Sequence, residues 1–186
     1  MNLIDPSYFI GEINIAGTDR PEVLDSLNAL ISKYESMFLR DVLGIELFNL
    51  FVAGLPYQFP TLLDQRYLYL RDGVLFIVDG ITYRWRGFVE EKNDAIKKRS
   101  IIADYIYYWY LRDVNTFQTP VGETSALTHN SVTASPNVKM TRAWNDMVDG
   151  VFELRFFLQQ NSIMYPEYQT VITPASYFQK LNNFGI

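Results

Sequence analysis

The sequence contains no cysteine, and His129 is its single histidine. Without cysteine the chain can form neither disulfide bonds nor thiolate metal sites, and it is compatible with reducing and oxidising compartments alike. His129 lies in a polar stretch, and no second imidazole is present to complete a metal site or a proton relay. We therefore interpret His129 as a surface residue, and we expect no bound metal and no cofactor.

Long apolar runs are missing as well. No uninterrupted apolar segment approaches the roughly 20 residues that are needed to span a bilayer. Residues 1–14 carry no basic flank ahead of an apolar run, so no signal peptide is expected. No repeat with a period of about 20 to 50 residues is present, which argues against a solenoid. The sequence therefore predicts a soluble protein that reaches its place of work from the cytosol.

Basic residues are outnumbered, with 16 Lys and Arg against 21 Asp and Glu and a formal net charge of −5. Affinity for nucleic acid comes largely from basic side chains that neutralise phosphates, so this balance argues against tight non-specific binding of DNA. One basic cluster exists, formed by Lys97, Lys98 and Arg99. It is a candidate contact with a phosphate or an acidic partner, although a solvated helix face is the simpler interpretation.

Aromatic residues are abundant instead: 13 Tyr, 13 Phe and 3 Trp make up 16% of the 186 residues. A chain of this length with 48% hydrophobic residues can bury the core of a single domain. Large rings with a polar tip are also enriched in contact surfaces between proteins. Either a tyrosine-rich core or aromatic subunit and partner interfaces would account for this composition.

Apolar residues recur at helical spacing over Glu22–Ala53, which predicts one long helix that is kinked or divided at Gly44. Ahead of it, residues 7–15 alternate weakly, as is typical of an extended arm or edge strand. The next stretch, residues 55–72, holds two prolines and several aromatic residues. We expect an irregular connection there, with at most one helical turn.

The clearest β signal covers residues 73–87, where two alternating apolar runs flank the tight-turn dipeptide Asp79-Gly80. Helical spacing returns over residues 90–114, with a charged opening and an apolar band that is nearly continuous around its centre. A last amphipathic helix is predicted over residues 137–161, with a glycine at position 150 as its weak point.

These elements predict a mainly α fold with a small β-hairpin. We expect a helical connector-type domain over residues 21–162, an N-terminal arm over residues 1–20, a mobile polar loop over residues 115–137 and an aromatic docking tail over residues 163–186. The loop and the tail are the predicted contact segments. The candidate interface residues are Thr116, Pro120, Leu127 and Pro136 in the loop and Tyr165, Tyr168, Tyr177 and Phe178 in the tail.

No catalytic arrangement stands out in the sequence. Glu90 and Glu91 are neighbours, and neighbouring residues do not face one another on a helix. Gly73, Gly80 and Gly87 recur at a fixed interval but match no phosphate-binding motif, so we interpret them as hairpin geometry. The serine- and threonine-rich loop lacks nucleophile-elbow spacing. The sequence therefore predicts a protein that is not an enzyme.

Several stretches together resemble one protein family. They are KYESMFLRDVLG in the first long helix, YRWRGF at the end of the hairpin and SIIADYIYYWYLRD in the next helix, followed by a polar loop and a tryptophan-containing helix. Over roughly residues 5–160 the chain resembles the head-to-tail connector proteins of tailed bacteriophages, the neck or portal-adjacent adaptor rings, of the kind found in Bacteroides and crAss-like phages. The shared features are packing motifs, and none is a catalytic signature.

The resemblance implies a structural virion protein that is made in the host cytoplasm and sits at the head–tail interface. It implies a ring of about twelve copies beneath the portal protein. Such a ring joins the next neck or tail protein and lines the channel through which double-stranded DNA passes without specific binding during packaging retention and ejection. A tail-completion or tail-terminator subunit is an alternative function, and a soluble protein-interaction domain is another.

Overall fold

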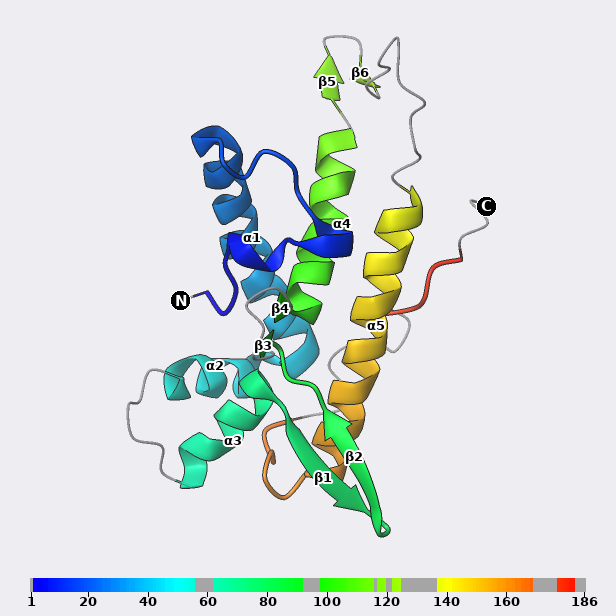
Figure 1. Ribbon diagram of the computed structural model, residues 1–186. Helices are drawn as coiled ribbons and strands as arrows, with labels where there is room; N and C mark the ends of the chain where they lie inside the picture. Colours follow the sequence, from blue (N-terminus) through cyan, green and yellow to red (C-terminus); the bar gives the residue numbers. More distant parts are fainter. Residues whose placement is uncertain are drawn as a thin grey trace.

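The computed structural model describes residues 2–55, 62–91, 98–115, 117–119, 122–124, 137–168 and 177–182. Within them the protein is mainly helical with small antiparallel hairpins, as the sequence predicts (Figure 1). The helices are α1 (Pro21–Leu43), α2 (Ile45–Gly54), α3 (Leu62–Asp72), α4 (Ile101–Asn115) and α5 (Asn137–Gln160). The strands pair as β1 (Val74–Val78) with β2 (Ile81–Trp85), β3 (Glu90–Glu91) with β4 (Lys98–Arg99), and β5 (Phe117–Thr119) with β6 (Gly122–Thr124).

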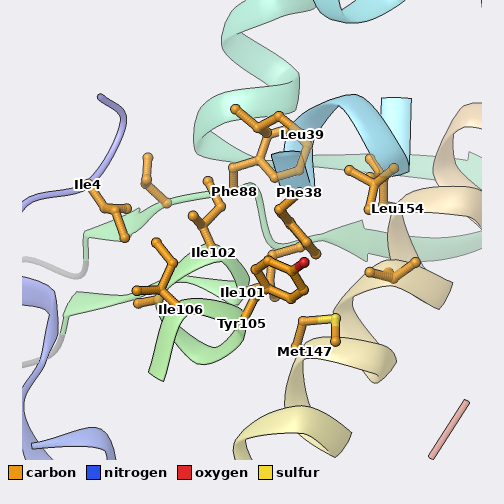
Figure 2. Close-up of a cluster of buried hydrophobic side chains, with 14 of the residues drawn as sticks. Ile4, Phe38, Leu39, Phe88, Ile101, Ile102, Tyr105, Ile106, Met147 and Leu154 are labelled. Atoms are coloured by element: carbon orange, nitrogen blue, oxygen red, sulfur yellow. The ribbon is translucent and has the colours of Figure 1, made fainter. Parts of the chain in front are cut away.

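Three long helices, α1, α4 and α5, lie side by side and enclose the core (Figure 1). Figure 2 shows Phe38 from α1, Tyr105 from α4 and Met147 from α5 gathered in one buried cluster. Aromatic rings pack throughout this core; those of Phe38 and Tyr105, for example, lie 5.0 Å apart between centroids. A tyrosine-rich core therefore accounts for much of the aromatic content.

Helices α4 and α5 approach one another closely at Gly150. A Cβ at this position would lie 2.3 Å from Cγ2 of Ile101, a distance that no real side chain tolerates. Helix α5 nevertheless continues unbroken through Gly150. The glycine that the sequence suggested as a weak point is thus the contact that lets the two helices pack.

The predicted division of the first helical segment is confirmed. Helix α1 ends at Leu43, and Gly44 adopts φ +75°, a left-handed backbone conformation that side chains disfavour. Its N–H donates to the carbonyl of Arg40 at 2.9 Å, which closes the last turn of α1, and α2 begins at the next residue. The change of direction between the two helices follows from this one residue.

The predicted hairpin is also confirmed, with Asp79-Gly80 at its turn and Phe76 paired with Tyr83. One face of the hairpin packs on α5, where the Phe76 ring lies 5.2 Å from that of Phe157. At its root, the indole N–H of the fully buried Trp85 donates to the carbonyl of Leu70 at 3.2 Å. The root therefore belongs to the core, whereas the tip extends beyond the end of the helices (Figure 1).

Two sequence expectations about helix boundaries are wrong. Residues 62–72 form helix α3 rather than an irregular connection, because both prolines of this stretch precede the helix and Leu70 is fully buried. The helix that was expected from residue 90 begins at Ile101. The Ser100 hydroxyl oxygen accepts the N–H groups of Ile102 and Ala103 and caps this start.

The charged residues before α4 pair across two short strands instead. Glu90 lies opposite Arg99, and Glu91 lies opposite Lys98. Opposite charges in cross-strand positions stabilise the paired strands. This pairing replaces the helix that the sequence predicted from residue 90. Lys98 and Arg99 therefore sit on a strand and not on the helix face that the sequence suggested.

The chain ends pack on the core to a greater extent than expected. Residues 7–15 form two 3-10 turns, Pro6–Tyr8 and Gly11–Ile13, rather than an edge strand, and Tyr8 and Phe9 are buried. Near the other end, the Tyr165 hydroxyl donates to the carbonyl of Arg66 at 2.7 Å. Phe178 is fully buried against Phe38. The described parts of both ends are thus integral to the fold.

Candidate functional site

A charged pocket of about 500 Å³ lies between the N-terminal turns and the helix pair α4–α5. Its walls come from residues 10–13, the connection from β2 to β3, strand β4 with the start of α4, and the first turns of α5. Five basic and four acidic side chains line it. The pocket thus gathers residues that are far apart in the sequence.

Two contacts hold Ser100 and Gly87 in place in the pocket wall. The Ser100 hydroxyl donates to the carbonyl of Phe88 at 2.7 Å and also caps α4, so this serine is held in a structural role. Gly87 adopts φ +89°, and a Cβ there would lie 2.5 Å from the backbone of Gly73. The glycine spacing in the sequence therefore reflects close backbone contact as well as hairpin geometry.

Several of the charged groups already have partners within the protein. The Arg86 guanidinium forms a paired hydrogen bond with the Glu153 carboxylate on α5, which ties the hairpin root to that helix. Arg142 pairs with Glu12 at 3.1 Å across the pocket rim.

Two further charged groups of the pocket, those of Glu90 and Lys98, contact neighbouring segments. Arg84 donates to Glu90 at 2.7 Å. Lys98 donates to the Ser7 hydroxyl at 2.9 Å and lies over the Tyr8 ring. These contacts, like the Arg86 and Arg142 pairs, hold the pocket walls together and leave other charges for binding.

Asp104 is the most perturbed acid of the pocket. It lies on the pocket-facing side of α4, where burial and the like charge of Asp146 raise its pKa to about 7, against the opposing effect of Arg86 and Arg99. Burial likewise raises the pKa of Asp146, with Glu12 and Asp149 adding to the effect. A carboxyl group that titrates near neutral pH can either accept or donate a proton under physiological conditions.

The sequence around Asp104 carries one signal of its unusual environment. Asp104 is the only charged residue in the apolar stretch SIIADYIYYWY. Burying a charge in a helix is costly unless the charge is paired or hydrogen-bonded, so such a residue is a candidate for a functional role. Asp146 and Glu12 gave no comparable signal, because each lies among polar residues and only the fold brings them to the same pocket.

The basic cluster that the sequence singled out is partly placed. Lys98 and Arg99 both line the pocket, whereas Lys97 lies outside the described residues. Arg99 and Lys139 of α5 are both exposed, and both line the pocket. For Lys98 and Arg99 the interpretation as a helix face is therefore corrected, since these two residues lie on strand β4 beside the pocket.

The candidate interface residues separate into three groups. The four loop residues lie outside the described part of the chain; they are Thr116, Pro120, Leu127 and Pro136. Tyr165 and Phe178 are buried in the protein's own core, which corrects the expectation that their rings are free for docking. Tyr168 is half-buried, and Tyr177 keeps 50% of its surface exposed while its ring packs on that of Phe178.

A second surface feature is the hairpin end. Leu75 is 65% exposed and Ile77 is 71% exposed on the face of the hairpin that points away from α5. Ile81 near the tip and Ile163 in the turn after α5 are exposed as well. Figure 1 places the hairpin tip and this turn at the same end of the molecule. We call these four residues the apolar end.

No group of three or more His, Asp or Glu side chains in the described ranges is arranged to hold a metal ion. Among the helices that the structure describes, none has the length and apolar character required to cross a membrane.

Comparison of the chain with protein-family models, with curated proteins and with solved structures finds no match. The function must therefore be argued from the two surface features, the charged pocket and the apolar end, together with the sequence pattern.

Proposed function

We propose that this chain is a structural, non-enzymatic subunit of a ring in the neck of a tailed bacteriophage. In this proposal the ring joins the portal to the tail and surrounds the channel through which DNA passes. The resemblance of the sequence to head-to-tail connector proteins suggests this role. The observation that carries it is the apolar end, because a ring subunit needs an exposed surface that neighbouring copies can cover.

The hairpin supplies such a surface by its register. Leu75 lies opposite Arg84 and Ile77 lies opposite Thr82, so these four side chains share the face that points away from α5. Leu75 and Ile77, the apolar residues of this face, are more exposed than most large apolar residues in a folded monomer. Covering apolar surface contributes about 25 cal/mol for each Å² that leaves water. The hairpin therefore favours association.

The hairpin also has open edges. Among the strands that the structure describes, β1 and β2 pair only with one another, so the outer edge of each is open to pairing with a further strand. Exposed edges of apolar strands add strands from other chains readily. A head-to-tail contact of this kind, repeated with a rotation that closes, produces a ring. The occupant that we assign to the apolar end is a second copy of this chain.

The charge of the protein suits a channel for DNA. The net charge of −5 disfavours adhesion to a phosphate backbone that must slide past. Two of the five basic side chains that line the pocket are paired with acidic partners, Arg86 with Glu153 and Arg142 with Glu12. We therefore assign the DNA a passing contact without specific binding.

The test is the mass of the purified protein alone and mixed with portal particles, measured by native mass spectrometry or light scattering. We expect either a ring in isolation or one copy for each portal subunit after mixing. The double variant Leu75→Ser with Ile77→Ser should lose this assembly. Val138→Ser, which changes an exposed apolar residue near the start of α5, is the matched control and should assemble normally.

The outcomes separate the alternatives. A monomer that ignores portal but binds tail-tube particles would favour a tail-completion or tail-terminator subunit. A monomer that binds neither would overturn the ring proposal and leave a protein-interaction domain. Assembly that survives the double hairpin variant would show that the apolar end is not the subunit contact.

A further inference from the structure

The charged pocket holds two kinds of charge that its protein contacts do not use. On the acidic side, the carboxyl groups of Asp104 and Asp146 form no hydrogen bond or ion pair with any described residue. On the basic side, the charged groups of Arg99 and Lys139 likewise form none within the described ranges. The remaining charged groups of the pocket are engaged by neighbours, as shown above for Arg86, Arg142, Lys98 and Glu90.

Asp104 is the member that most requires an explanation. Its side chain is half-buried and lines the pocket, and its carboxyl group has no hydrogen-bond donor among the described residues. Partial removal from water destabilises a carboxylate unless a hydrogen bond or a cation compensates. Because the carboxyl group borders a cavity, such a partner is best sought in that cavity.

The position of the charges specifies the chemistry of that partner. The half-buried Asp104 and the exposed Asp146 both line the pocket, and the charge of Asp146 acts on Asp104, so a group that contacts both should be a cation that donates hydrogen bonds. Arg99 and Lys139 are exposed at the rim, where they favour an anion. The volume of about 500 Å³ lies in the range of about 300–1,000 Å³ that is usual for small-ligand sites.

We propose that the pocket binds a ligand with a guanidinium or ammonium group and a carboxylate, the cation on Asp104 and Asp146 and the carboxylate on Arg99 and Lys139. Arginine has this chemistry, both as the free amino acid and as the last residue of a polypeptide. This inference does not depend on the ring proposal, because it concerns a different surface and a different ligand.

The site should respond to pH with a defined sign. The cation binds the ionised carboxylate, and the Asp104 carboxyl is ionised only above its pKa of about 7. The groups that face it are Asp146 from α5, Arg86 from the β2–β3 connection, Arg99 from β4 and Glu12 from the N-terminal turn. Affinity should therefore be about tenfold higher at about pH 8 than at about pH 6.

The experiment is isothermal titration calorimetry of the full chain with three probes: L-arginine, agmatine, which lacks the carboxylate, and a short peptide that ends in arginine. We expect L-arginine to bind at about pH 8 with a dissociation constant of about 1 mM or lower. Agmatine should bind more weakly, because it cannot use the rim cations. A peptide that binds more tightly than the amino acid would identify a polypeptide terminus as the source, and the reverse order would identify a small molecule.

Three variants test the assignment of residues. Asp104→Asn should abolish binding, while the control Asp25→Asn, at an exposed acid of α1, should leave it unchanged. Lys139→Gln should weaken arginine but not agmatine. Circular dichroism confirms that each variant is folded. The proposal is overturned if Asp104→Asn binds arginine as the wild type does, if affinity does not fall with pH, or if the wild type shows no binding at about 10 mM.

Discussion

The root and the tip of the β1–β2 hairpin use similar residues in opposite ways. At the root, Trp85 is fully buried and hydrogen-bonded to Leu70, and its ring lies 5.6 Å from that of Phe88. Toward the tip, on the face that points away from α5, Ile77 lies largely in water. The buried apolar side chain at the root stabilises the fold, whereas the outward-facing side chain toward the tip contributes little to it and is available for contact. Substitutions at the two ends should separate these roles.

The largest effect is expected at the root. Replacing Trp85 with Ala removes a buried ring and its hydrogen bond, so the free energy of unfolding should fall by about 3–5 kcal/mol. Replacing Ile77 with Ala should change it by less than about 0.5 kcal/mol, because the side chain is exposed. Urea denaturation followed by circular dichroism measures both. Equal losses from the two substitutions would contradict the distinction between root and tip.

The glycines of the hairpin give the next comparison. Gly87→Ala places a Cβ 2.5 Å from backbone atoms at a left-handed φ of +89°, and we expect a loss of about 3 kcal/mol. Gly80→Ala at the turn has a similar φ of +79° but no atom within 4 Å. Its loss should be about 1 kcal/mol, from backbone strain alone. If thermal melts show the same loss for both, close contact at the root is not what requires Gly87.

A smaller effect is expected where the N-terminal segment joins α1. The buried Glu35 carboxylate accepts the N–H groups of Leu3 at 2.8 Å and Ile4 at 3.2 Å. Glu35→Ala should cost about 2 kcal/mol and increase hydrogen exchange at these two amides. Glu22→Ala, at an exposed residue of the same helix, should change neither quantity. Unchanged exchange at residues 3 and 4 in Glu35→Ala would contradict this anchoring role.

A last effect depends on pH. The pKa of Asp104 is raised from 3.8 to about 7, so the folded protein retains a proton that the unfolded chain releases. Stability should therefore decrease as pH rises between about pH 4 and pH 7. Asp104→Asn removes this dependence. Between about pH 4 and pH 7 its free energy of unfolding should therefore fall by less than that of the wild type. Denaturation curves across this range check the sign, and parallel curves for the two proteins would contradict it.

The sequence predicted well the elements that local signals encode. The Asp-Gly turn, Gly44 and the helical spacing of residues 137–161 act over a few residues, and each appears in the structure as expected. Element boundaries near residues 62 and 101 were missed. In the second case the capping hydrogen bonds of Ser100 and the pairing of Glu90 with Arg99 outweighed the helical pattern of the charged stretch.

The pocket could not be predicted in the same way. Asp104 and Asp146 come from different helices, and Glu12 comes from a turn that packs on both of them only after folding. The perturbed state of Asp104 depends on burial and on like charges that are distant in the sequence. The tail was misjudged for a related reason, because Tyr165 contacts Arg66 and Phe178 contacts Phe38, about one hundred or more residues earlier in the chain.

The backbone contact between Gly73 and Gly87 joins the two surfaces of the molecule. Gly73 begins the hairpin, and Gly87 forms part of the pocket wall, with no side chain between them to absorb a displacement. The clamp of Arg86 on Glu153 lies beside this contact. A rotation of the hairpin must therefore change the shape of the pocket. By thermodynamic reciprocity, a ligand that prefers one pocket shape also favours one hairpin orientation. The proposed ligand binding and the proposed assembly would then be linked equilibria, and each could be measured through the other.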